Sequence, residues 1–210
     1  KVFYDRAHII WPPFSVNKDN AVIIARLCQL LEGNPLALEL AATQLNEYDL
    51  ETLLSELSSS YLLLASDLQD LPPRQRSIYN TLNYSWQLLS PALAELLARC
   101  SVFRANFSYQ AATAITGASA RLITQLINRS LLSNDEQRRV QIHEMVRQFA
   151  ASKLAQNPTL EAATQKRYAE YFLGLLLQWW EGNESRHWVV QLLPDMNNIY
   201  AAWDWAFSHQ

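Results

Sequence analysis

The sequence predicts a mainly α-helical protein with one small β-hairpin. Apolar residues recur at three- and four-residue spacing through most of the chain, and only the segment 131–143 breaks that period, around a polar tip. The 210 residues include only four glycines, fewer than an all-β fold with many tight turns usually needs. Half of the residues are hydrophobic and 11% are aromatic, which is enough for a packed core and unlike a disordered chain.

Charge divides the chain into three blocks, which we interpret as three domains. Residues 1–71 contain four Lys or Arg and ten Asp or Glu, residues 72–155 contain ten and four, and residues 156–210 contain three and six. Together with the prolines near both borders, this predicts a helical domain at 1–70, a winged-helix domain at 71–156 and a helical tail at 157–210. A basic middle block suits nucleic acid, and it equally suits an acidic neighbour in the same chain.

Capping and helix-breaking residues set the elements expected in the first domain. An opening helix ends before Trp11-Pro12-Pro13, and Gly33 ends a helix over 21–31. Asn34 then caps a helix over 35–45, whose first residue is Pro35, where the missing N–H costs nothing. A further helix is expected over 50–58.

Beyond the Leu71-Pro72-Pro73 border the pattern predicts four helices, a hairpin and another helix, which is the plan of a winged-helix domain. The polar tip 134–137 lacks a favoured two-residue turn, so we expect a longer loop. The tail reads as one long helix and two shorter ones that begin a repeat-like helical array. The expected helices run over 77–88, 91–100, 108–117, 119–131, 144–154, 159–180, 184–193 and 195–208.

The sequence lacks the motifs that are typical of several kinds of catalytic and metal-binding site. It has no glycine-rich phosphate loop, no zinc-ligand spacing and no catalytic cysteine pattern, so we expect no enzyme activity of the chain itself and no metal site. Cys28 and Cys100 lie in apolar helical patterns, which favours reduced thiols and a cytoplasmic compartment. No long uncharged apolar run predicts a membrane span. The chain begins and ends within helical patterns, so we expect it to be part of a longer protein.

Several segments resemble one family. Leu31 to Leu40, LEGNPLALEL, resembles the G-x-P motif that follows the nucleotide-binding core in NB-ARC and related signalling ATPases of the STAND class. Ile142-His143-Glu144 resembles their M-H-D motif, and the resemblance covers nearly the whole chain in the family's order. Further segments are similar to the start and end of the winged helix and to the helix leading into the repeats: Arg74 to Ser77, Ser85 to Ser90, Ser101 to Phe103, Leu126 to Leu132, Ile142 to Ala150, Asp195 to Ile199 and Ala201 to Trp203.

The resemblance implies roles for two residues. Pro35 would lie against the adenine of a bound nucleotide, although a proline there is equally a plain helix starter. His143 would contact the β-phosphate of ADP in a closed state, and otherwise it caps a helix or lies half-buried at a strand-to-helix junction. Ile142 replaces the family's methionine and keeps an apolar anchor, whereas Glu144 replaces its aspartate and leaves the partner of that acid open.

The resemblance also implies a function: a regulatory fragment of a nucleotide-dependent signalling or transcription-regulating switch that couples ADP/ATP state to output. The fragment itself would hold no cofactor, while the parent protein would bind ADP or ATP with Mg and act as a slow ATPase switch. The expected partners are the nucleotide-binding domain of the same chain, helical repeats after the tail and other proteins, with no membrane contact.

Two alternatives stay open from the residues themselves. In the first, a DNA-binding winged helix would use the helix 119–131 for recognition and contact nucleic acid through Arg121, Arg129, Arg138 and Arg139. Against it, four apolar residues occupy the core face of that helix, and only two arginines lie on it. In the second, a protein-interaction scaffold would use an aromatic groove in the tail, although these residues most simply form core between tail helices: Tyr171, Phe172, Trp179, Trp180, Trp188 and Trp203.

Overall fold

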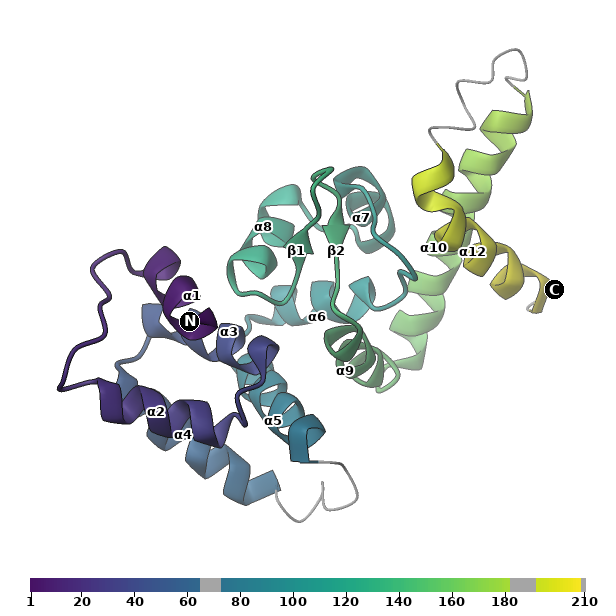
Figure 1. Ribbon diagram of the computed structural model, residues 1–210. Coiled ribbons are helices and arrows are strands. Elements are labelled where there is room, and N and C mark those ends of the chain that lie inside the picture. The colour runs from purple at the N-terminus through teal and green to yellow at the C-terminus, as the bar shows by residue number, and fades with distance from the viewer. Residues whose placement is uncertain (65–72, 182–191, 209–210) are drawn as a thin grey trace. The chain divides into compact units, whose positions relative to one another are not determined.

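A computed structural model describes residues 1–64, 73–181 and 192–208 (Figure 1). These residues contain eleven α-helices and one two-stranded antiparallel hairpin, which confirms the predicted fold class. Two compact units make up the chain, one from residues 1–90 with 128–130 and the other from residues 91–127 with 131–210. The three-domain division stays a prediction beside this grouping.

The first unit is a helical bundle. The helix α3 contacts both α1 and α5, while α4 contacts α2 and α5. The core between them consists mainly of leucines and alanines, including Leu27, Leu31, Ala41 and Leu53, none of which is exposed. Its elements are α1 (Val2–Ile10), α2 (Ala21–Leu30), α3 (Pro35–Thr43), a 3-10 turn η1 (Gln44–Asn46), α4 (Leu50–Leu64) and α5 (Pro73–Gln87).

The turn between α2 and α3 forms as the sequence predicts. Glu32 and Gly33 both adopt positive φ, at 53° and 64°, and the Gly33 N–H donates to the Cys28 carbonyl at 2.9 Å. Asn34 then caps α3, because its side-chain oxygen accepts the N–H of Ala37 at 3.2 Å. Interactions between residues close in the sequence therefore determine both the chain reversal after α2 and the start of α3.

Helices α4 and α5 are longer than predicted. The serine run that suggested an end near residue 58 continues the helix, because the Ser58 hydroxyl donates to the Leu54 carbonyl at 2.6 Å and is satisfied within it. α5 begins at Pro73, four residues before the predicted start, and packs on α3 and α4. Leu71 and Pro72 of the predicted border lie outside the described residues.

The second unit begins with three helices and a hairpin in the winged-helix order. Phe107 exchanges two 2.8 Å backbone hydrogen bonds with Val140, which adds a third short segment to the hairpin. Ser133 pairs with Gln141 and Asn134 with Val140. The elements are α6 (Pro91–Cys100), α7 (Tyr109–Thr116), α8 (Ala120–Asn128, whose last residue groups with the first unit), β1 (Ser133–Asn134), β2 (Val140–Gln141) and α9 (Glu144–Leu154).

The hairpin loop is longer than two residues, as predicted. Arg138 adopts φ 59° and its N–H donates to the Asp135 carbonyl at 3.0 Å. α8 ends at Asn128, three residues before the predicted end. Ser130 has φ 56°, and the N–H groups of Leu131 and Leu132 both return to the Leu126 carbonyl, so the helix cannot continue.

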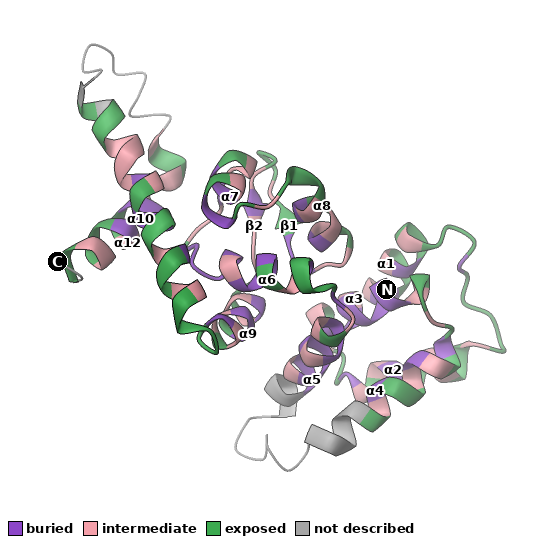
Figure 2. Ribbon diagram, turned by 180° about the vertical axis from the view of Figure 1, so that it is seen from behind, coloured by how far each residue is buried: buried purple, intermediate pink, exposed green. Residues whose placement is uncertain are grey.

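The tail consists of α10 (Pro158–Glu181), a 3-10 turn η2 (Leu193–Asp195) and α12 (Met196–Ser208). Of the predicted helix 184–193, all but the last two residues lie outside the described residues. α10 contacts α7, α9 and α12, so the tail shares one core with the winged-helix elements. Figure 2 shows buried positions of α10 and α12 where the two helices meet, and exposed or partly buried positions along the rest of both helices.

Four aromatic rings form the centre of that shared core. Phe103 stacks on Phe107 with ring centroids 3.7 Å apart, and Tyr168 and Phe172 approach Phe103 edge-on at 5.7 and 6.3 Å. The core prediction for the tail aromatics is right for Phe172. It is wrong for Trp180 and Trp203, which are 69% and 60% exposed. α12 instead buries the stripe of Asn198, Ile199 and Ala202, whereas Trp179 and Trp188 have no described side chain.

Candidate regulatory site

Pro35 lies at the first position of α3 and is exposed. The capping side chain of Asn34 precedes it, and the buried residues Ala37 and Leu38 follow it. The ring therefore presents a rigid apolar surface at the start of a helix, which is compatible with both interpretations made from the sequence. Pro35 belongs to the first unit, whereas His143 belongs to the second. A nucleotide contacted by both residues stays a prediction.

His143 is the N-cap of α9. Its backbone is extended, and its ring Nδ1 lies 3.2 Å from the N–H of Met145. Because Nδ1 accepts this hydrogen bond, the neutral ring carries its proton on Nε2. The residue is exposed, so the Nε2–H group can donate to a ligand at the positive end of the helix dipole.

The partner of Glu144 is Arg147, one turn further along α9. The guanidinium donates to both carboxylate oxygens, at 2.8 and 2.7 Å, and Gln148 adds a 2.8 Å hydrogen bond. These hydrogen bonds, first those from Arg147 and then that from Gln148, lower the pKa of Glu144 to about 2. Arg147 also donates to the carbonyl of Ser101, the residue after α6, at 3.4 Å. The Glu144–Arg147 pair is thereby connected to the end of α6.

The four arginines proposed for DNA contact divide into two pairs. Arg121 on α8 and Arg138 at the hairpin tip are exposed. Arg129 forms a 2.8 Å ion pair with Glu47 inside the first unit. Arg139 is mostly buried and bonds within the second unit. Two of the four side chains thus already have acidic partners, and a DNA contact by these arginines stays a prediction.

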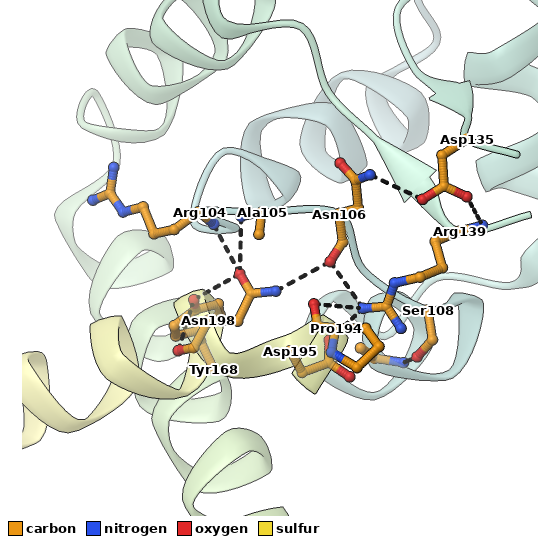
Figure 3. A network of polar contacts seen from close by, with 11 residues as sticks. Arg104, Ala105, Asn106, Ser108, Asp135, Arg139, Tyr168, Pro194, Asp195 and Asn198 are labelled. Carbon is orange, nitrogen blue, oxygen red and sulfur yellow. Dashed lines mark hydrogen bonds and ion pairs between the residues drawn. The ribbon is translucent and has the colours of Figure 1, made fainter. Parts of the chain in front are cut away.

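A buried polar network joins the winged-helix elements to the tail, and the sequence did not single it out (Figure 3). Its centre is Asn198 on α12, which is not exposed at all. The side-chain oxygen of Asn198 accepts the backbone N–H groups of Arg104 and Ala105, at 2.9 and 3.2 Å. Its amide nitrogen donates to the Asn106 carbonyl at 3.3 Å. One side chain therefore forms hydrogen bonds with all three residues of the loop 104–106 that precedes Phe107.

Tyr168 completes the surroundings of Asn198 from α10. Its hydroxyl lies 3.1 Å from both the backbone carbonyl and the side-chain oxygen of Asn198. Burial raises the pKa of Tyr168 above its ordinary value of 10.0, so the hydroxyl keeps its proton and acts as the donor.

The hairpin reaches the same loop from the other side. Arg139 donates to the Asn106 carbonyl at 2.9 Å and forms an ion pair with Asp195, the last residue of η2 before α12. Asp135 accepts the Asn106 side-chain amide at 2.9 Å and the backbone N–H of Arg139 at 2.8 Å. The hydrogen bond from that backbone N–H is the main reason that the pKa of Asp135 lies below its usual range.

One sequence signal could have found the network. Asn198 stands on the apolar stripe of α12 beside Ile199 and Ala202, where a polar residue is unexpected unless it is hydrogen-bonded. By its sequence alone, the segment from Asp195 to Ile199 shows only a resemblance to the helix that leads into the family's repeats.

The described residues offer no metal site, since no three His, Cys, Asp or Glu side chains among them are placed to hold an ion. Within the same residues, no helix is both long enough and apolar enough to cross a membrane.

Comparison with known proteins identifies distant homologues. Two relatives, from Mycobacterium tuberculosis strain H37Rv and from Mycobacterium bovis, carry the name "Putative HTH-type transcriptional regulator" and are each 26% identical over 218 aligned residues. The alignment covers 98% of this chain and 24% of each relative, so the chain spans about a quarter of their length. An "Uncharacterized protein" of M. tuberculosis H37Rv is 31% identical over 115 residues, covering 55% of this chain and 29% of that protein. No family model matches the chain.

Proposed function

We propose that this chain is the regulatory segment of a nucleotide-dependent switch that controls transcription. In the full-length protein, the segment would sense ADP or ATP bound to a separate nucleotide-binding domain and pass that state to the tail. Two findings support the proposal. The homology to much longer proteins named as transcriptional regulators extends over 98% of the chain. The motif order resembles that of the STAND class over nearly the same length.

The observation that carries the proposal is the state of His143. Its Nδ1 is occupied by the Met145 N–H, which leaves Nε2–H available at the N-terminus of an 11-residue helix. Helix N-termini favour anions, and a phosphate accepts hydrogen bonds strongly. Glu144 would otherwise oppose an anion there, but Arg147 and Gln148 engage its carboxylate.

The physical mechanism is a shift of population by differential contacts. ADP contacted by both the nucleotide-binding domain and His143 would hold the winged-helix elements in a closed arrangement. Exchange for ATP, without the same contact, would release them. A hydrogen bond to a charged group contributes about 1.5–3 kcal/mol, so its loss should speed ADP release about 10- to 100-fold.

The test compares two substitutions in the full-length protein, with dissociation of a fluorescent ADP analogue as the readout. His143→Ala removes both the cap and the Nε2–H donor. His143→Ser keeps a capping oxygen and removes only the imidazole. We expect faster ADP release and raised basal output from both variants.

Fast release from the alanine variant alone would assign His143 a capping role and contradict nucleotide sensing. An unchanged ADP dissociation rate in both variants would also contradict nucleotide sensing by His143.

DNA binding by the winged helix is the second candidate, favoured by the printed name of the relatives and by the helix-and-hairpin order. It would have to rely on Arg121 and Arg138, because Arg129 and Arg139 are engaged. DNA retardation in a gel at low salt, weakening steeply as salt rises, would favour this candidate.

A further inference from the structure

We infer that Asn198 is the positioning residue that locks the tail helices α10 and α12 to the winged-helix elements, so that these parts of the second unit move as one rigid body. The inference rests on the proposed function only in the role that it gives this joint, because a switch needs a rigid connection to transmit a movement to the tail. The joint itself stands on contacts within the second unit (Figure 3).

The first argument is that Asn198 is fully buried and that both its side-chain oxygen and its amide nitrogen form hydrogen bonds. Its side-chain oxygen accepts two backbone N–H groups and lies 3.1 Å from the Tyr168 hydroxyl, while its amide donates to the Asn106 carbonyl. Sliding α12 along its neighbours would leave the Arg104 and Ala105 N–H groups without this acceptor. Buried donors without partners are costly, so the geometry has one favourable arrangement rather than a continuous range.

The second argument is that the loop 104–106 is held from two sides. Asn106 contacts Asn198 of the tail through its carbonyl and Asp135 of the hairpin through its side-chain amide. Arg139 connects these two sides, because it bonds the Asn106 carbonyl and pairs with Asp195. Hairpin, loop and tail are therefore linked by common hydrogen-bond partners, and none of them can shift without breaking contacts to the other two.

The third argument is the apolar packing beneath the network. The stacked pair Phe103 and Phe107 flanks the loop, and Tyr168 and Phe172 of α10 pack edge-on against Phe103. Directional hydrogen bonds and interdigitated rings specify the same arrangement. A movement caused by nucleotide exchange would therefore occur outside this joint.

The test uses hydrogen exchange of the Arg104 and Ala105 amides, measured by NMR, together with a spin-label distance between α8 and α12. The labels are placed on cysteines introduced at the exposed positions Thr124 and Asp204 after Cys28→Ser removes the more accessible native thiol. In the otherwise unchanged protein we expect slow exchange at both amides and one narrow distance distribution.

Asn198→Leu should speed exchange of both amides at least about tenfold and broaden the distance distribution. Asn198→Asp keeps an acceptor for the two N–H groups but replaces the amide donor that faces the Asn106 carbonyl with a second oxygen, so its exchange should be slower than that of Asn198→Leu. Asn197→Leu changes the exposed neighbour and should alter neither measurement. A broad or two-peaked distribution without any substitution at Asn198, or unchanged exchange in Asn198→Leu, would overturn the inference. Neither readout involves a nucleotide, so this failure is distinguishable from failure of the proposed function.

Discussion

Replacement of Tyr168 by phenylalanine removes one hydroxyl from the joint and keeps the ring that packs against Phe172 at 4.9 Å. The hydroxyl is buried and lies 3.1 Å from two oxygens of Asn198. After the substitution the Asn198 side-chain oxygen still accepts two backbone N–H groups, so no buried acceptor loses its last partner. We therefore expect the free energy of unfolding of the second unit to fall by about 1 kcal/mol at pH 8.

The difference in unfolding free energy between Tyr168→Phe and the unsubstituted protein should become smaller at high pH. Because burial raises the folded-state pKa of Tyr168 above 10.0, its stabilising contribution is complete below pH 10 and is lost as pH rises toward the folded-state value. Above pH 10 that loss approaches about 1.4 kcal/mol per pH unit. Tyr168→Phe has no such group, so its deficit of about 1 kcal/mol should shrink to about zero near pH 11.

Urea unfolding followed by circular dichroism at pH 8, 9, 10 and 11 measures this difference. Tyr200→Phe is the matched control on α12, since Tyr200 is 64% exposed, and it should follow the unsubstituted protein at each pH. A Tyr168→Phe variant as stable as the unsubstituted protein at pH 8 would refute the hydrogen-bond argument. A deficit that stays constant from pH 8 to pH 11 would refute the burial argument.

Two further predictions concern local features. Arg147→Met should return the pKa of Glu144 from about 2 toward its ordinary value of 4.5, because the main hydrogen-bond donors are lost. An NMR titration of the carboxyl carbon checks this, and an unmoved midpoint would contradict it. Gly117→Ala should destabilise the second unit by about 1 kcal/mol, because Gly117 ends α7 at φ 74°, a region that a Cβ disfavours. Its control Gly174→Ala lies inside α10, where the added Cβ would meet no atom within 4 Å apart from its chain neighbours and the backbone of its own helix, and it should stabilise the unit by about 0.5–1 kcal/mol. Thermal unfolding of the two glycine variants should therefore shift in opposite directions, and shifts of the same sign would show that backbone conformation does not decide the outcome.

The sequence predicted those fold features that depend on neighbouring residues. Asn34 and Gly117 act within a turn of their own position, and both define helix ends where expected. The predicted ends of α4 and α8 were wrong by several residues. Their outcome depends on the hydroxyl of Ser58 bonding inside its helix and on a positive φ at Ser130, and composition does not reveal either.

The candidate site was predictable to a similar degree. His143 lies at a helix start, which was one of its two expected structural roles, and the Arg147 partner of Glu144 is three residues away on the same helix. The joint around Asn198 was not predictable in this way. It pairs residues more than 90 positions apart in the chain, and such pairs follow from the packing of α10 and α12 rather than from local pattern.

The basic middle block left open whether its charge serves nucleic acid or acidic neighbours in the same chain. Arg129 pairs with Glu47 of the acidic block 1–71, and Arg139 pairs with Asp195 of the acidic block 156–210. Each pair thus joins the basic block to an acidic one. An arginine that is mostly buried against a carboxylate would have to lose that partner before it could reach a phosphate. For these two arginines, the charge asymmetry of the sequence therefore serves contacts inside the chain, and a hairpin that holds the tail through Arg139 acts as a docking element.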